Sequence, residues 1–265
     1  MKAKLILICM LFGMLPVVFA DDVRSESLKV KFAYQYSGNY PFQTGEGTID
    51  WKKPGIAVEL LMMVGKKLDI DIEFSRVPWK RGLHDLKKGQ KDGLFNASFK
   101  KKRLEYGVYP MKDGIADQNR KSYSNSYVLY KIKGSPVQWN GKTFSNLNGP
   151  IVATRGFSIL DDLIKMGIKV REANSTLVSL KILSKGRVKG IAALELAGDY
   201  LLDKNKDEFS NIEKVLPPIK TKPYYLMLSH QFIKKNPKIA EEIWNTVREV
   251  RESEEFKQVT GKYFQ

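Results

Sequence analysis

The sequence is nearly free of cysteine. Its one cysteine, Cys9, lies among the first 20 residues, within a stretch that we interpret as a removable leader. A chain with one cysteine cannot form an internal disulfide, and once the leader is lost it has no thiol nucleophile. An exported protein of this size that has no cysteine once its leader is removed is more typical of the bacterial periplasm than of disulfide-stapled extracellular modules.

Histidine is also scarce, and His84 and His230 are the only two in the chain. We interpret both as surface or packing residues. The sequence shows no nucleophile and base pair, no cluster of metal ligands and no glycine loop that would cradle a phosphate. It therefore predicts no catalytic residue, no metal site and no cofactor.

Long hydrophobic runs are absent except at the start of the chain. Residues 5–19 are apolar, they follow Lys2 and Lys4, and small residues precede the point after Ala20. This pattern is typical of a secretory signal peptide. A membrane anchor is the alternative, but a glycine and a proline interrupt the run, which is shorter than a comfortable span. We predict export to the periplasm with cleavage after Ala20.

Acidic residues are few beside the basic ones. The chain has 29 Asp and Glu against 45 Lys and Arg, a net charge of +16, which becomes +14 when Lys2 and Lys4 leave with the signal. Such a field attracts anionic solutes, anionic lipid surfaces or nucleic acid. The lysines are spread along polar helix faces, however, and form no patch interleaved with aromatic residues. We interpret them as solvated surface charge and expect no nucleic-acid partner.

Segments of helical and strand periodicity alternate through the rest of the chain. Apolar alternation predicts strands near 28–34, 70–74 and 93–97, and one-face spacing predicts helices over 56–68 and 79–86. This order, in a chain of 265 residues, predicts one large or two medium α/β domains.

A basic run, Lys100 to Arg103, follows the strand expected at 93–97. Ligands of open α/β sheets bind outside the carboxyl ends of the strands, so this run lies where a ligand would bind. The aromatic loop 36–42 follows the first strand. Its rings either stack on a ligand or pack against the first helix.

The first half of the chain resembles a known family. The motifs are, in order, the loop Tyr40-Pro41-Phe42, the helix start Gly55-Ile56-Ala57-Val58-Glu59-Leu60, the pair Pro78-Trp79, and Leu86-Lys87-Lys88-Gly89-Gln90-Lys91-Asp92 leading to Arg103. They are similar to the first lobe of the family 3 extracellular solute-binding proteins, periplasmic receptors that serve importers of polar amino acids. Where that family usually has Thr-Pro-Glu-Arg, this chain has Lys100-Lys101-Lys102-Arg103, so only the arginine remains.

The likeness continues to the end of the chain. The matching segments are the strand at 123–130, the strand, turn and helix at 151–164, the helix, glycine and strand at 175–194, the strand at 224–228, the helix that begins at Pro237, and the aromatic helix at 256–264. The order helix, glycine, strand at 175–194 repeats one found in the first half.

The resemblance implies an α/β, two-lobe periplasmic-binding-protein-like fold of type II, with a hinge of two strands and a cleft between the lobes. We expect a signal peptide at 1–20, a first lobe formed by 21–124 with 222–265, and a second lobe at 125–221. The resemblance also implies a monomer that closes on a small-molecule ligand, an amino acid or a related organic anion, for import through an inner-membrane ABC permease.

The resemblance further points to ligand-binding residues. Arg103 is the strongest candidate, because a guanidinium can hold a carboxylate through two parallel hydrogen bonds. The other candidates are Ser98, Asn96, Trp79 and Tyr40 in the first lobe and Arg155, Ser158 and Glu195 in the second. Backbone N–H groups at 156–158 open a predicted helix and could also bind an anion.

The end of the strand at 191–194 departs from the family pattern. Members that bind amino acids usually have an Asp there to receive the ammonium group, whereas this chain has Leu194 followed by Glu195. An organic anion therefore competes with an amino acid as the expected ligand, unless Glu195 turns inward.

Two other functions fit the same resemblance. Cyclohexadienyl dehydratases share the fold and need a positioned acid in the cleft, for which Glu195 is the candidate. A sensor that reports a ligand to a membrane partner without transport is the other alternative.

Overall fold

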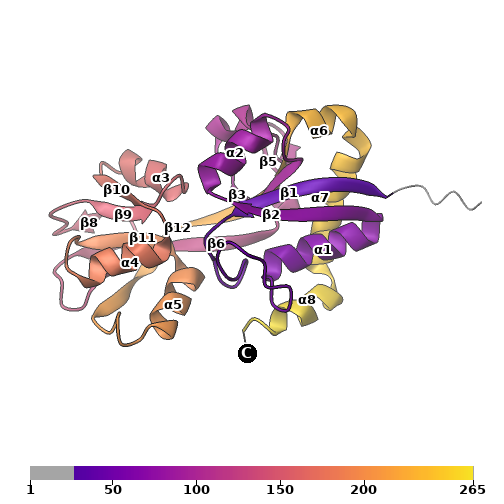
Figure 1. The fold of residues 1–265 in the computed structure, drawn as a ribbon. Coiled ribbons are helices and arrows are strands. Elements are labelled where there is room, and N and C mark those ends of the chain that lie inside the picture. The colour runs from indigo at the N-terminus through magenta and orange to yellow at the C-terminus, as the bar shows by residue number, and fades with distance from the viewer. Residues whose placement is uncertain (1–26, 265) are drawn as a thin grey trace, which may run out of the picture.

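The computed structural model describes residues 27–264. The predicted signal peptide, its cleavage point and Cys9 lie outside the described residues and stay predictions. Within the described part, no helix is both long and apolar enough to cross a membrane. Two α/β lobes stand side by side, and two long strands run between them (Figure 1).

The first lobe contains elements from both ends of the chain. They are β1 (Leu28–Gln35), α1 (Ile56–Leu68), β2 (Ile70–Val77), α2 (Trp79–Lys87), β3 (Gly93–Ser98), the 3₁₀ turns η1 (Lys101–Glu105) and η2 (Gln118–Arg120), the short strands β4 (Met111–Lys112) and β5 (Ile115–Ala116), and the C-terminal helices α6 (His230–Lys235), α7 (Pro237–Glu252) and α8 (Glu254–Gly261). Helix α7 begins with a proline, which the first turn of a helix accommodates because its N–H would have no partner there. The predicted strands and helices of this half are confirmed.

The second lobe lies between those two segments in the sequence. Its elements are β6 (Tyr123–Ile132), β7 (Gln138–Trp139), β8 (Phe144–Ser145), β9 (Ile151–Thr154), α3 (Ile159–Lys165), β10 (Val170–Ala173), α4 (Thr176–Ser184), β11 (Gly190–Leu194), α5 (Glu195–Lys204) and β12 (Ile212–Leu228). The hydroxyl of Ser175 accepts a hydrogen bond of 3.2 Å from the N–H of Val178, so it caps α4 as expected.

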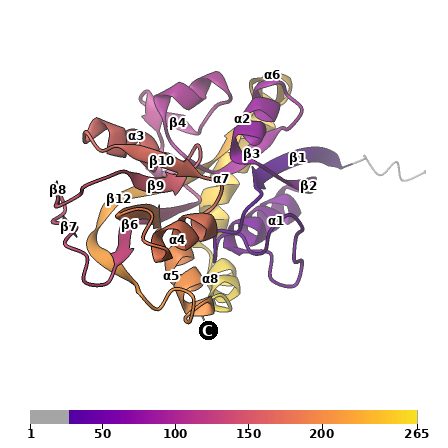
Figure 2. The ribbon, with the colours of Figure 1, turned by 60° about the vertical axis from the view of Figure 1, so that its left-hand side comes forward.

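One curled mixed sheet of eight strands runs through both lobes, in the order β10-β9-β11-β6-β12-β3-β1-β2. In the first lobe β1 is parallel to both neighbours, β2 and β3, and in the second β9 is parallel to both β10 and β11. The antiparallel pair β6 and β12 joins the two sets. Because the parallel strands end toward the junction, the loops that follow them meet between the lobes (Figures 1 and 2).

Each lobe has its own hydrophobic core. In the first lobe α1 and α7 pack on one face of the sheet, with Leu60, Leu61 and Trp244 almost fully buried, and α2 packs on the other. In the second lobe separate clusters form around Leu163 and Leu180. The predicted boundaries after residues 124 and 221 fall within β6 and β12, and they stay a prediction.

Strand β12 is longer than the sequence suggested. The predicted strand covered residues 224–228, whereas β12 spans Ile212–Leu228. Two prolines, Pro217 and Pro218, interrupt the sequence pattern of a strand. The sheet accommodates them because the pairing of β12 with β6 shifts register between Val215 and Lys220.

Candidate functional site

A small cavity lies at the junction of the lobes. It is lined by Gln35, Asn39, Gln43, Trp79, Asn96, Ser98 and Arg103 of the first lobe, by Phe157, Ser158 and Leu194 of the second, and by Tyr127 and Tyr224 of the two joining strands. Its volume of about 30 Å³ corresponds to roughly two water molecules. Two larger grooves lie between the lobes. The groove of about 650 Å³ shares Gln43 with the cavity, and the groove of about 600 Å³ shares Arg103 and Phe157 with it.

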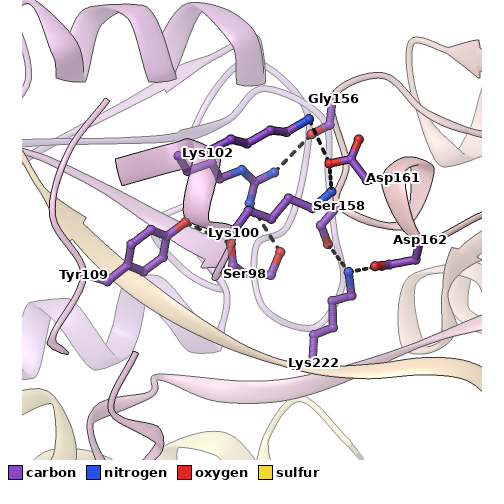
Figure 3. A network of polar contacts seen from close by, with 10 residues as sticks. Ser98, Lys100, Lys102, Tyr109, Gly156, Ser158, Asp161, Asp162 and Lys222 are labelled. Atoms are coloured by element: carbon purple, nitrogen blue, oxygen red, sulfur yellow. Dashed lines mark hydrogen bonds and ion pairs between the residues drawn. The ribbon is translucent and has the colours of Figure 1, made fainter. Parts of the chain in front are cut away.

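Arg103 is buried at the centre of this junction, with 4% of its surface exposed. Its guanidinium donates 2.7 and 3.3 Å hydrogen bonds to the carbonyl and hydroxyl oxygens of Ser98, and a 3.1 Å bond to the carbonyl of Gly156 in the second lobe (Figure 3). It also lies 5.0 Å from the ring centre of Trp79, a cation–π contact. One side chain therefore touches both lobes.

A buried tyrosine shares a hydrogen-bond acceptor with this arginine. The hydroxyl of Tyr109 donates a 2.9 Å hydrogen bond to the same carbonyl of Ser98 that accepts from Arg103. Burial raises the pKa of Tyr109 to about 12, although the nearby charge of Arg103 opposes the shift. The hydroxyl therefore stays a donor at physiological pH. Its bond fixes the carbonyl of Ser98, at the end of β3, to which Arg103 also donates.

The turn at Gly156 allows the close approach of the lobes. Gly156 has a φ of +74°, and a β-carbon there would come within 3.2 Å of the Trp79 ring. A glycine satisfies both constraints. The N–H of Phe157 already donates to Thr154, and α3 begins only at Ile159. This arrangement leaves less backbone free for an anion than the sequence suggested.

Ion pairs connect the lobes beside the arginine. Asp161 of α3 accepts from Lys100 and, at 2.8 Å, from Lys102 (Figure 3). Burial alone would raise the pKa of Asp161, but the hydrogen bonds and charges of the two lysines outweigh it and lower that pKa to about 2. Burial lowers the pKa of Lys100 to about 8 despite its bond to Asp161. The basic run that follows β3 thus holds the second lobe.

A second ion pair lies next to the cavity-lining residue Ser158. Lys222 of β12 pairs with Asp162 and donates a 3.0 Å hydrogen bond to the hydroxyl of Ser158. A lysine ammonium can only donate, so Ser158 accepts this bond. The hydroxyl does not cap α3. Ser158 is 1% exposed and lines the cavity.

The two tyrosines of the joining strands add a further donor. Tyr224 donates a 3.0 Å hydrogen bond to the hydroxyl of Tyr127. Burial raises the pKa of both side chains, so both stay protonated. Because Tyr127 accepts from Tyr224, its own hydroxyl proton can be directed to another acceptor.

The structure brings five of the eight predicted residues together at the cavity: Arg103, Ser98, Asn96, Trp79 and Ser158. Asn96 is notable for its backbone, because it has a φ of +61° within β3. There β3 and β12 shift register, so that Phe95 and Asn96 lie opposite the single residue Leu226. Such a bulge turns the Asn96 side chain toward the cavity.

The other three predicted residues lie outside the cavity lining. The ring of Tyr40 stacks on Tyr200 with centroids 4.2 Å apart, and it lines the larger groove.

Arg155 and Glu195 do not reach the cavity because ion pairs hold them elsewhere. Arg155 pairs with Glu172 at 3.1 Å and is exposed. Glu195 opens α5 and accepts from Lys214 at 2.8 Å, and Lys214 also pairs with Asp199. The acid that the dehydratase alternative requires is thus turned away from the cavity, and Leu194 occupies the wall.

Sequence reasoning missed seven of the lining residues: Gln35, Asn39, Gln43, Tyr127, Phe157, Leu194 and Tyr224. The carboxamides of Gln35, Asn39 and Gln43 lie at the end of β1 and in the following loop, where Asn is also an ordinary turn residue and Gln an ordinary polar one. Their position past the carboxyl end of a parallel strand was the available signal. Within residues 27–264, no group of three or more His, Cys, Asp or Glu could hold a metal ion.

Comparison with known families agrees with this geometry. The family model of bacterial extracellular solute-binding proteins, family 3, matches residues 35–265. The chain belongs to this family. The predicted family and the type II two-lobe fold are therefore confirmed. No curated protein sequence matches the chain.

Solved structures with the same fold include binding proteins and a sensor domain. An arginine-specific periplasmic binding protein of Salmonella typhimurium is 15% identical, with a TM-score of 0.68 over 90% of this chain and 100% of its own. A histidine-bound substrate-binding protein of a Streptococcus pneumoniae ABC transporter is 15% identical, with a TM-score of 0.69 over 89% and 92%. A histidine kinase sensor domain is 15% identical, with a TM-score of 0.70 over 91% and 96%. At such identities the likeness shows the fold.

Proposed function

We propose that this family 3 protein captures a small carboxylate-bearing solute between its two lobes, with Arg103 as the main contact. The observation that carries the proposal is that the arginine is buried beside neutral hydrogen-bond partners. Arg103 is buried, and among the described residues its hydrogen-bond partners are neutral oxygens of Ser98 and Gly156. A buried guanidinium without an anionic partner is costly. A ligand carboxylate supplies that anion.

Capture requires the lobes to move. A cavity of about 30 Å³ is too small for most carboxylates, so the lobes part to admit the solute and close again around it. The bond from Arg103 to Gly156 and the pairs of Lys100 and Lys102 with Asp161 cross the junction and re-form on closure. The ligand shifts the equilibrium by its greater affinity for the closed form.

The cellular setting follows from the family and the predicted signal peptide. We infer that the chain works as a monomer in the periplasm after cleavage behind Ala20, and that its closed form delivers the solute to an inner-membrane ABC permease. Amino-acid ligands of the similar solved structures support a small solute with a carboxylate. The histidine kinase sensor domain among them makes ligand sensing the alternative outcome.

Thermal-shift screening followed by isothermal titration calorimetry tests the proposal. The exported protein is screened against amino acids, hydroxy acids, dicarboxylates, neutral sugars and divalent metals. We expect stabilisation by a subset of the carboxylates, together with a smaller radius of gyration in solution scattering. Stabilisation by sugars or metals alone would contradict the proposal.

A further inference from the structure

The side chains of Gln43 and Asn96 have a fixed orientation. The amide nitrogen of Gln43 donates to the backbone carbonyls of Gln35 at 3.0 Å and Ser37 at 2.6 Å, and carbonyls only accept. The amide oxygen of Gln43 is therefore at the other end, where it accepts a 2.6 Å bond from the amide nitrogen of Asn96. This leaves the amide oxygen of Asn96 as the free end of the pair.

Three buried amide oxygens in the cavity lining have no hydrogen-bond partner among the described residues. They are Oδ1 of Asn96, Oε1 of Gln35 and Oδ1 of Asn39. These three side chains are at least nine-tenths buried. A buried acceptor without a partner is costly, so a donor group on a ligand gains from meeting it. The indole N–H of Trp79, in the same lining, is a buried donor without a partner among the described residues. The wall formed by the first lobe thus offers three acceptors beside two donors, Arg103 and Trp79.

The charge of the lining limits what that donor can be. Among residues 27–264 that line the cavity, Arg103 is the one charged side chain. Leu194 occupies the wall at the end of β11, and Glu195 is paired with Lys214. A ligand carboxylate neutralises Arg103, but an ammonium group would then be buried opposite neutral oxygens without an anion. A hydroxyl or amide N–H satisfies the same oxygens with a smaller loss of hydration.

We propose that the cavity selects carboxylates whose second polar group is an uncharged hydrogen-bond donor, such as 2-hydroxy acids, over the corresponding zwitterionic amino acids. The proposal rests on carboxylate capture by Arg103 and adds the chemistry of the group beside the carboxylate. The acceptors are the amide oxygens of Asn96, Gln35 and Asn39.

Matched acids that differ in one group test this selection. Calorimetry compares sets of three acids that share a side chain and carry a hydroxyl, an amino group or hydrogen at carbon 2. The smallest set is lactate, alanine and propionate, and the largest set has an indole side chain. We expect the hydroxy acid of the best-bound set to bind at least about tenfold tighter than both other members, the effect of roughly one hydrogen bond. Equal or tighter binding of the amino acid, or of the unsubstituted acid, overturns the selection but leaves carboxylate capture intact. Binding of none overturns both.

Two substitutions in the cavity lining and one control outside it locate the effect. Asn96→Gly removes the carboxamide and keeps a backbone that suits positive φ, so we expect about tenfold weaker binding of the hydroxy acid and little change for the unsubstituted acid. Asn146, an exposed residue with a φ of +56°, gives the matched control Asn146→Gly, which should change neither. Leu194→Asp should shift preference toward the amino acid. An Asn96→Gly protein that keeps the tenfold preference for the hydroxy acid contradicts the assigned acceptor.

Discussion

The two lobes contribute different chemistry to the cavity. The wall from the first lobe carries the buried Arg103, the indole of Trp79 and four carboxamides, whereas the second lobe contributes Phe157, Ser158 and Leu194. The charged residues of the second lobe near the junction, Asp161 and Asp162, bind lysines instead. Under the proposed function, we therefore expect the first lobe to recognise the ligand and the second lobe to close over it.

Loss of the arginine should have the largest effect. Arg103→Met keeps an unbranched apolar stem but removes the guanidinium and the two charge-assisted hydrogen bonds that a carboxylate would accept, so we expect affinity to fall by at least about 100-fold. Calorimetry with the tightest carboxylate measures this. Arg248 lies exposed on α7, and Arg248→Met serves as the control with unchanged affinity. A loss below about threefold in Arg103→Met would show that the first lobe recognises something else.

A change in the second lobe should alter release more than capture. Phe157 lines the cavity and packs against the core of its lobe. In Phe157→Ala we expect dissociation to be about tenfold faster and association almost unchanged, because the encounter occurs on the first lobe. Stopped-flow fluorescence measures both rates. Slower association with unchanged dissociation would reverse the roles of the lobes. Phe264→Ala, at an exposed position, is the control.

The ion pairs across the junction should have a smaller effect. Asp161→Asn removes the partners of Lys100 and Lys102, and partly exposed pairs of this kind contribute about 0.2–1 kcal/mol each. We expect affinity to fall about threefold at low salt and the difference to shrink in high salt. Asp203→Asn removes an exposed pair with Lys206 and should have no effect. If the loss in Asp161→Asn does not depend on salt, the contact is not electrostatic.

The smallest effect concerns acid pH. Neighbouring lysines hold the pKa of Asp161 at about 2, below its ordinary value of 3.8. A lowered carboxyl pKa stabilises the folded, paired form above the ordinary value, and that contribution is lost as the pH falls toward 2. The difference in melting temperature between wild type and Asp161→Asn should be constant above pH 4 and decrease below it. A difference that grows as the pH falls would contradict this assignment.

Much of the fold could be predicted because local patterns and tertiary structure agree. The apolar stripe of α1 and the alternation of β1 and β2 each match one buried face. Arg103 could be placed at the junction because it follows a strand whose carboxyl end faces the other lobe. These features depend on short stretches of sequence.

The rest depends on contacts between distant residues. Glu195 forms an ion pair with Lys214 and does not line the cavity. Lys214 lies on β12, whose first half was not predicted because Pro217 and Pro218 interrupt the strand pattern. The carboxamide of Gln43 accepts a hydrogen bond from Asn96, which is 53 residues away in the chain. Neither contact has a local signal.

A crystal structure with the tightest carboxylate from the screen tests the central claim most directly. The account predicts a ligand between the lobes, with its carboxylate about 2.8 Å from both terminal nitrogens of Arg103. A carboxylate bound in either of the two larger grooves, with the guanidinium hydrogen-bonded to Ser98 and Gly156 alone, would contradict it.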